Sequence, residues 1–247
     1  MRSIPAVVVF LALVFAAAPS VADVTVKMTT TSTTGGMTVE VSSVSYVKGM
    51  KGRMDVKGAG QDLSILQDVA AKQQLMVNHV TKLVETSDPK ASMANMGDPT
   101  VSVKPSGQTK EILGRTCTGY MMIVSIPMTV GEETFTITNT SLVWLAKGGA
   151  DVVEWQAFSK AAAAAGILTG SFMQGPQGRG AAELQKLYAE NGIPFETEMQ
   201  LKIEGNGPMA QKMAQRGNVA MTMKVTAIST DPIPDDVFVV PAGYTKK

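Results

Sequence analysis

The chain has 247 residues, with 22 lysines and arginines against 21 aspartates and glutamates, so its formal net charge is only +1. A charge this close to zero provides no attraction to phosphate backbones or anionic membrane surfaces, and it argues against a nucleic-acid partner. The chain contains one cysteine, Cys117, so no intramolecular disulfide can form. The alternating sequence around Cys117 predicts a buried, inert thiol, and intermolecular pairing is the alternative.

The N-terminal segment has the features of a secretory signal. Arg2 provides a positive start, residues 4–18 are apolar with one proline among them, and the small residues Ser20 and Ala22 fit the pattern that signal peptidase cleaves. We therefore expect cleavage after Ala22 and a periplasmic or secreted mature chain, with an uncleaved anchor as the alternative. No later segment has the roughly 20 apolar residues of a spanning helix, so we expect no membrane span in the mature chain.

Most of the remaining sequence has the patterning of strands. Apolar and polar residues alternate in many short segments, which is typical of antiparallel strands with one buried face. Gly49 and Gly52 separate two of these segments and predict a hairpin turn. The segments assigned as strands are 24–29, 37–42, 43–47, 53–56, 63–66, 74–77, 80–84, 110–113, 118–126, 134–145, 196–203 and 219–228. Together they predict one antiparallel sheet.

Two helices are predicted within an insert at residues 151–192. Asp151 and Glu154 have the spacing of a capping box, and Gly166 is a suitable stop for the first helix. The second helix is expected at 181–191. Their apolar stripes are Trp155, Phe158, Ala162 and Ala165 on the first helix, and Leu184, Leu187 and Tyr188 on the second.

Residues 86–108 interrupt the strand pattern with prolines and glycines, and we expect a long excursion there. The segment is too short to be a domain of its own. The predicted organisation is a signal peptide at residues 1–22 followed by a single domain at residues 23–247, in which the excursion and the helical insert interrupt the sheet.

No set of residues predicts catalysis. A Ser-His-Asp triad would need His79, the one histidine of the chain, and no Gly-x-Ser-x-Gly motif presents a nucleophilic serine. His79 lies between two predicted strands, so a solvated turn histidine is the simpler interpretation. Asp231, Asp235 and Asp236 bracket two prolines, which favours a tight turn over an acid and base pair. We expect no enzymatic activity and no cofactor.

The metal-binding potential is also small. One histidine and one cysteine at separate positions cannot form a zinc site, so we expect no metal. The chain does contain 17 methionines, and Met93, Met96, Met209 and Met213 could offer thioethers to Cu(I). Most methionines instead occupy apolar positions of strands. This placement indicates a soft core or an adaptable apolar wall for a hydrophobic ligand.

Four stretches of sequence carry a resemblance to known proteins. They are Tyr46-Val-Lys-Gly-Met-Lys-Gly-Arg-Met-Asp55, Gln67-Asp68 with Lys72-Gln73, Ile112-Leu-Gly-Arg-Thr-Cys-Thr-Gly-Tyr120, and Phe238-Val-Val-Pro-Ala-Gly-Tyr244. In this order they resemble an uncharacterised family of exported bacterial proteins with a domain of unknown function. The order is also similar to that of the wider superfamily of periplasmic lipoprotein carriers, outer-membrane receptor lipoproteins and mycobacterial lipid carriers.

The resemblance implies a mainly β fold of the α+β class. Its sheet would be a curled antiparallel half barrel, with two or more helices over the concave face and an apolar cavity between them. Acyl chains are the ligands it implies, so a lipid or an acylated protein is the expected partner in the cell envelope. The candidate cavity residues are Met121, Ile123, Trp144, Leu145, Trp155, Phe158, Met221 and Met223. The alternative is a structural or interaction protein of the envelope with a solid core and no ligand. The oligomeric state stays open.

Overall fold

The computed structural model describes residues 22–86, 97–167, 186–215 and 219–247. Residues 1–21 of the predicted signal peptide, Leu184, Met93 and Met96 lie outside the described residues. Within the described part of the chain, no helix is both long enough and apolar enough to cross a membrane.

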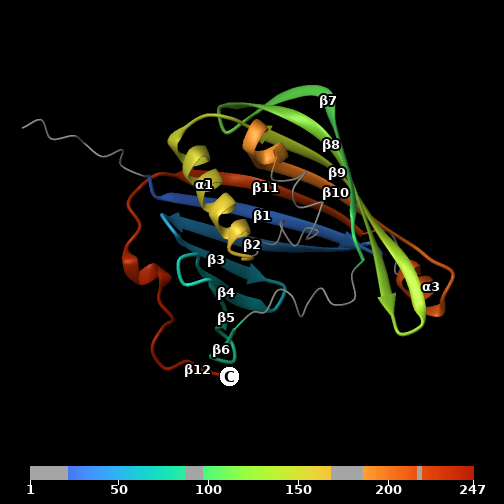
Figure 1. The fold of residues 1–247 in the computed structure, drawn as a ribbon, viewed down its shortest axis with the longest axis horizontal. Coiled ribbons are helices and arrows are strands. Elements are labelled where there is room, and N and C mark those ends of the chain that lie inside the picture. The colour runs from blue at the N-terminus through green and yellow to red at the C-terminus, as the bar shows by residue number, and fades with distance from the viewer. Residues whose placement is uncertain (1–21, 87–96, 168–185, 216–218) are drawn as a thin grey trace, which may run out of the picture.

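All strands of the described residues belong to one sheet (Figure 1). Consecutive strands pair as antiparallel neighbours from β1 to β6 and from β7 to β11, and β1 pairs with β11 to join these two halves. The short C-terminal strand β12 adds to β6 in parallel. The strands are β1 (Val24–Thr34), β2 (Met37–Lys48), β3 (Lys51–Gly58), β4 (Gln61–Asp68), β5 (Gln73–Asn78), β6 (Leu83–Thr86), β7 (Thr100–Ile112), β8 (Arg115–Val130), β9 (Glu133–Ala146), β10 (Ile193–Glu204), β11 (Val219–Ser229) and β12 (Thr245–Lys246).

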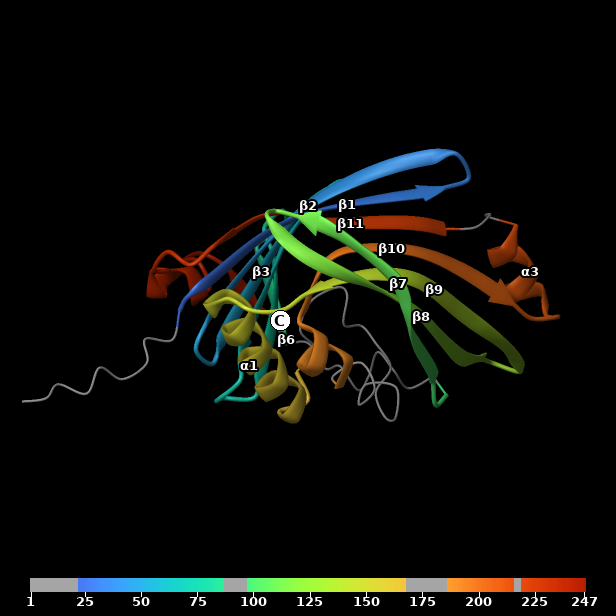
Figure 2. The same ribbon diagram turned by 90° about the horizontal axis from the view of Figure 1, so that it is seen from above.

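The sheet curls strongly without closing on itself. Its outer strands are β7 at one end and β12 at the other, and Figure 2 shows the strands between them arching over. Strand twist accumulates in one direction across a sheet, which is the physical origin of such a curl. The prediction of a mainly β fold with a curled antiparallel sheet is confirmed.

The alternating sequence decides which face of each strand is buried. In β1, Val24, Val26 and Met28 are buried whereas Lys27 between them is exposed. The register places Val24 beside Val47 of β2, and Val47 beside Gly52 of β3. Because side chains alternate between the two faces of a strand, these positions form one continuous apolar face.

The predicted excursion at 86–108 is shorter than expected. Residues 87–96 are outside the described residues, but β7 begins at Thr100 and runs through Pro105, where its pairing with β8 becomes irregular. Proline has no N–H to donate, and a strand at the edge of a sheet tolerates this because its outer side needs no partner. The position of Pro105 is therefore consistent with β7 as an edge strand of the sheet.

The first helix, α1 (Ala150–Ala164), forms where it was predicted, but its start differs from the prediction. Gly149 occupies the N-cap position without any side-chain cap, so the capping-box assignment was wrong. Both acids have tertiary partners instead: Asp151 pairs with Arg115, and Glu154 accepts a hydrogen bond from the backbone N–H of Gly49. The last turn is followed by Gly166 with a positive φ, as the stop signal predicted.

The helix packs against one face of the sheet. Phe158 and Ala162 of α1 are buried in a core that also contains Val26, Met28 and Val47. Residues 186–191 form a further short helical segment, and α3 (Pro208–Ala214) lies against β10. Residues 168–185 of the predicted insert are outside the described residues.

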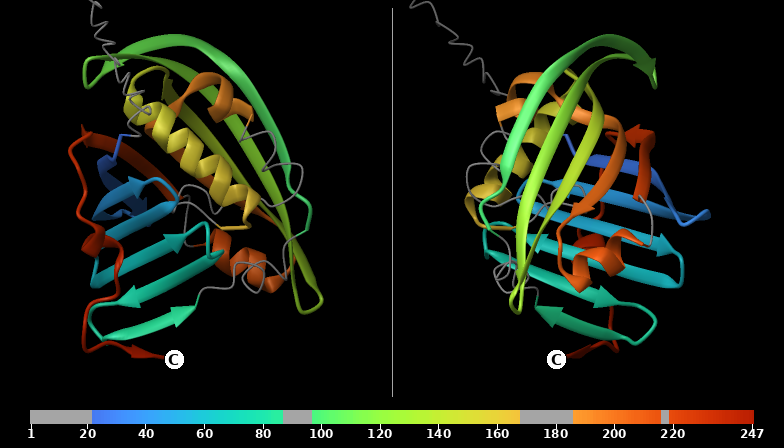
Figure 3. Two further views of the ribbon diagram at one scale, coloured as in Figure 1. Left: turned by 60° about the vertical axis from the view of Figure 1, so that its left-hand side comes forward. Right: turned by 90° about the vertical axis from the view of Figure 1, so that its right-hand side faces the viewer.

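The opposite face of β3 to β6 is covered by the C-terminal segment, residues 230–247. This segment contains the 3₁₀ turn η2 (Asp235–Phe238), and Figure 3 shows it running alongside β3 to β6 to the C-terminus. Val240 and Tyr244 pack on a small core, which consists of Leu66, Val77 and Val84. The sheet is therefore covered by α1 on one side and by the chain end on the other.

Candidate functional site

A cavity of about 480 Å³ lies between α1 and the apolar face of the sheet. The strands β1 to β4 form one wall, while α1 and residues 186–194 form the other. This volume falls within the range of small-molecule pockets. Its apolar lining includes Met28, Val47, Met54, Trp155, Phe158 and Ile193.

The sheet wall of the cavity is apolar because of the strand alternation. Met28, Val47 and Met54 are buried and point to the α1 side of their strands. Gly52 lies next to Val47 in the register, and it leaves room for the ring of Phe158. Polar groups on this wall are few, and they include Ser45 and Gln67.

The helical wall is held in place by contacts between α1 and residues 186–191. The Gln156 side-chain amide donates a hydrogen bond to the backbone carbonyl of Tyr188. The Tyr120 hydroxyl of β8 donates to Asn191 Oδ1 at 2.8 Å. Burial raises the pKa of the Tyr188 phenol to about 12, so this side chain is a neutral group at the cavity.

The N-terminal end of α1 is anchored by two acids. Asp151 is only 2% exposed, and both of its carboxylate oxygens accept hydrogen bonds from Arg115 Nη2 at 2.7 and 2.8 Å. Glu154 Oε1 accepts from the Gly49 N–H at 3.1 Å. Burial raises the pKa of Glu154, and the bond from Gly49 opposes that shift. These contacts hold α1 against β8 and against the hairpin between β2 and β3.

Two of the eight predicted cavity residues line this cavity, namely Trp155 and Phe158. The other six lie elsewhere. Met121 and Ile123 are 39% and 42% exposed on β8, and Met221 is half-buried on β11. The remaining three are buried: Leu145 among apolar residues of β8 and β9, Met223 in the core under α1, and Trp144 beneath Lys110. That a ligand contacts these side chains stays a prediction.

The residues of the sheet wall were not among those predicted from the sequence to line a cavity. Met28 belongs to a strand whose alternation was evident, but nothing local distinguishes it from other core positions. Met54 and Val47 flank the predicted hairpin. The available signal was Gly52, a glycine inside a strand, which often marks a close approach by another part of the chain.

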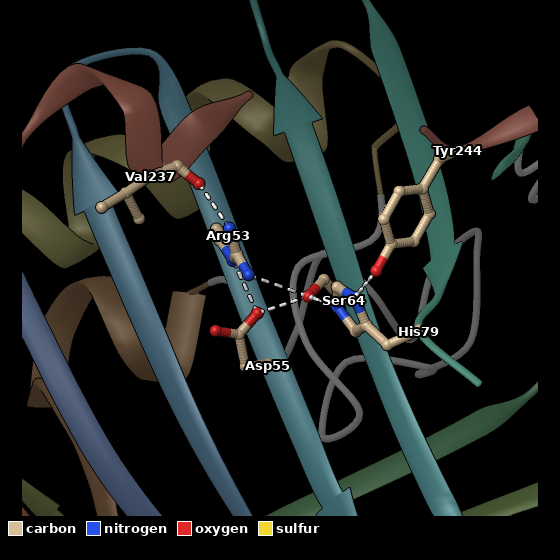
Figure 4. Close-up of polar contacts among 6 residues, drawn as sticks. All are labelled: Arg53, Asp55, Ser64, His79, Val237 and Tyr244. Carbon is tan, nitrogen blue, oxygen red and sulfur yellow. Dashed lines mark hydrogen bonds and ion pairs between the residues drawn. The ribbon is translucent and has the colours of Figure 1, made fainter. Parts of the chain in front are cut away.

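A second group of polar residues lies on the other face of the sheet, and we call it the clasp network (Figure 4). It consists of Arg53, Asp55, Ser64, His79 and Tyr244. Ser64 Oγ donates to Asp55 Oδ1 at 2.6 Å and lies 2.6 Å from His79 Nε2, while His79 Nδ1 lies 2.7 Å from the Tyr244 hydroxyl. Because Ser64 has one proton and gives it to Asp55, His79 Nε2 is the donor to Ser64 Oγ.

The clasp network corrects the interpretation of His79 as a solvated turn residue. His79 does lie in the turn after β5, but it is half-buried, and both of its ring nitrogens have partners. Its partner Tyr244 comes from the chain end, which no local pattern could indicate. Arg53 adds a further link, because its Nη1 donates to the Val237 carbonyl at 2.7 Å. The network thus fastens the C-terminal segment to β3, β4 and β5.

The order of groups in the clasp network differs from that of a hydrolase triad. In a triad the histidine lies between the acid and the serine and accepts the proton of the serine. Here Ser64 lies between Asp55 and His79, is only 1% exposed, and gives its proton to Asp55. The arrangement provides hydrogen bonds that hold strands together, with no exposed nucleophile in it.

Cys117 and Asp235 are two further residues that the sequence singled out for their chemistry. Cys117 is buried, as predicted, and desolvation raises the pKa of its thiol. Asp235 forms a salt bridge with Lys48 at 2.8 Å, and this contact lowers the pKa of Asp235. Among the described residues, no three histidine, cysteine or acidic side chains are grouped closely enough to hold a metal ion.

Comparison with known proteins gives matches among solved structures only. No family model matches the sequence, and no curated protein matches it. Two crystal structures of PNGF-II match 90% of this chain at 12% and 13% identity, with TM-scores of 0.37 and 0.32. The chain spans about 30% of the PNGF-II chain.

Two further structures match over most of both chains. A DUF1329 family protein from Desulfovibrio piger is 9% identical, with a TM-score of 0.32, and the match covers 90% of this chain and 91% of the other. A domain assigned as an outer membrane lipoprotein-sorting protein from Vibrio parahaemolyticus is 10% identical, also with a TM-score of 0.32. The match covers 89% of this chain and 90% of the other.

Proposed function

We propose that this protein binds the hydrocarbon part of an amphiphile in the cavity beneath α1. The observation that carries the proposal is the cavity itself, because its volume of about 480 Å³ lies against side chains that are mostly apolar. Apolar side chains around an unfilled space lose packing contacts, which an apolar ligand restores. A lipid or the acyl chain of a lipoprotein has this chemistry.

The proposal includes a role for the helices. In it, α1 and residues 186–191 cover part of the concave face of the curled sheet, and the ligand lies between the two layers. The burial of the lining residues supports this arrangement. Met54 and Val47 on the sheet side are buried, whereas Ala157 and Ala189 on the helical side are exposed. The cavity therefore opens between α1 and residues 186–191.

The proposal also places the protein outside the cytoplasm, in the periplasm or secreted. The support is the N-terminal sequence, with Arg2, the apolar residues 4–18 and the small residues up to Ala22. An envelope location would bring the cavity into contact with lipids and acylated proteins.

Native mass spectrometry tests the proposal. The full chain is expressed with its own N-terminal segment, purified from the envelope fraction, and analysed together with an organic extract. We expect a near-stoichiometric ligand that contains an acyl chain. A mass that matches the polypeptide alone, together with no rise in melting temperature when phospholipids are added, would contradict the proposal and favour an interaction protein with a solid core.

A matched pair of variants locates the ligand. Ala157 lines the cavity and is exposed, so Ala157→Trp fills the opening without disturbing buried packing. Ala164 is exposed on the same helix and does not line the cavity, so Ala164→Trp is the control. We expect Ala157→Trp to lose the copurified ligand and Ala164→Trp to retain it. Retention by both variants would place the ligand elsewhere.

A further inference from the structure

Among the described residues, the charged residues that line the cavity all have the same sign. They are Arg53, Lys160 and Lys186, and no aspartate or glutamate of the described part of the chain lines it. This bias is local, because the whole chain has 22 basic and 21 acidic residues. The excess of basic residues along this mostly apolar lining therefore does not follow from composition.

The two lysines are available to a ligand, whereas the arginine is not. Arg53 is held by Asp55, Ser64 and the Val237 carbonyl on the other face of the sheet. Lys160 and Lys186 are exposed, and neither forms a salt bridge within the described part of the chain.

The two exposed lysines lie on the helical wall of the cavity, across from the mostly apolar sheet wall. The buried wall on the sheet consists of apolar residues such as Val47 and Met54, and the lysines lie on the two helical segments that border the opening. Lys160 is on α1, and Lys186 is at the start of the segment 186–191. An occupant whose tail points to the sheet would therefore present its head group between these two lysines.

We propose that the ligand is an amphiphile with an anionic head group, which Lys160 and Lys186 hold at the cavity opening while its acyl chain lies against β1 to β3. The inference rests on the proposed function and specifies the ligand class for the same cavity. A carboxylate or a phosphate has the required chemistry, because either one accepts hydrogen bonds from ammonium groups and gains from their charge.

Binding of two matched lysolipids tests the inference. The full-length protein, freed of copurified lipid, is titrated with palmitoyl lysophosphatidylglycerol and with palmitoyl lysophosphatidylcholine, both below the concentrations at which they form micelles. The two probes share one acyl chain, but the first head group is anionic and the second is zwitterionic. We expect the anionic probe to bind about three- to tenfold more tightly, since each exposed lysine contributes a modest attraction. The preference should shrink as the salt concentration rises.

Variants assign the preference to these lysines. Lys160→Gln combined with Lys186→Gln should bring the two affinities together, mainly by weakening the binding of the anionic probe. The control is Lys104→Gln combined with Lys212→Gln, which removes the same charge at exposed positions that do not line the cavity. This control should keep the preference.

The outcomes separate the inference from the proposed function. Equal affinities in the unmodified protein, or a preference that survives in the Lys160 and Lys186 variant, would overturn the anionic assignment while the cavity still binds acyl chains. Failure of both probes to bind the lipid-free protein would overturn the proposed function itself.

Discussion

The ring of Phe158 occupies the space into which a side chain at Gly52 would project. A Cβ atom built on Gly52 would lie 2.4 Å from Phe158 Cζ and 2.9 Å from the side-chain oxygen of Gln67. Gly52 is in the middle of the sheet, and Phe158 comes from a helix more than a hundred residues later in the chain. This contact decides how closely α1 approaches β3, and so it sets one end of the cavity.

Substituting Gly52 should therefore strain the cavity wall. We expect Gly52→Ala to lower the free energy of unfolding by about 1–3 kcal/mol, the usual effect of overpacking a filled site. Phe158→Ala removes the obstructing ring, so the double variant should be more stable than the sum of the two single effects. Urea unfolding of the four proteins measures this coupling. Strictly additive effects would mean that the two residues do not press on each other.

The clasp network should stabilise the C-terminal segment. Tyr244→Phe removes the hydroxyl that forms a hydrogen bond with His79 Nδ1, and we expect a loss of about 1 kcal/mol in unfolding free energy. Hydrogen exchange should accelerate at the Thr245 and Lys247 amides, which bond to β6 and the turn before it. Val239→Ala, at an exposed position of the same segment, is the control and should change neither quantity. Unchanged exchange in Tyr244→Phe would show that the segment is held by packing alone.

Arg115 should be important for the docking of α1. Its removal leaves the carboxylate of Asp151 buried without a counter-charge, so we expect Arg115→Ala to lower stability by about 2–4 kcal/mol. The expected loss of stability is near the lower part of the range for a broken buried ion pair, because Arg115 is partly exposed to solvent. Asp151→Asn in the same chain should restore part of the loss. Thermal unfolding measures these changes in stability. Lys147→Ala, at an exposed position just before α1, is the control.

Glu154 should make stability depend on pH in a defined direction. Its pKa is raised in the folded protein from the ordinary value of 4.5, so the folded state binds more protons than the unfolded state just above that pH. Stability should therefore fall as pH rises through this window and then level off once the folded carboxyl is ionised. Glu154→Gln keeps an oxygen that can accept from Gly49 without acquiring a charge.

The stability difference between Glu154→Gln and the unmodified protein isolates this effect. As pH increases from about 4 towards neutrality, the variant should gain stability relative to the unmodified chain. Chemical unfolding at a series of pH values measures the difference. A difference that stays constant, or that changes in the opposite direction, would show that the hydrogen bond from Gly49 outweighs burial.

Most strands and their buried faces could be predicted from the sequence, whereas most of β7 was not. The alternation of Val24, Val26 and Met28 with polar residues sets which side of β1 is covered, because a period of two is a local property of extended backbone. It also located α1 and its end near Gly166. The edge position of β7 was encoded in Pro105, although the prediction treated that proline as part of an excursion.

Which of these surfaces contact each other depends on how the elements pack in the folded chain. Asp151 and Glu154 have the spacing of a capping box, yet the folded chain provides Arg115 and Gly49 as their partners. Trp144 and Trp155 were equally good candidates for the cavity, and only Trp155 lines it. The reason is physical: local patterns specify which face of an element is apolar, whereas the curl of the sheet and the docking of α1 specify what that face contacts.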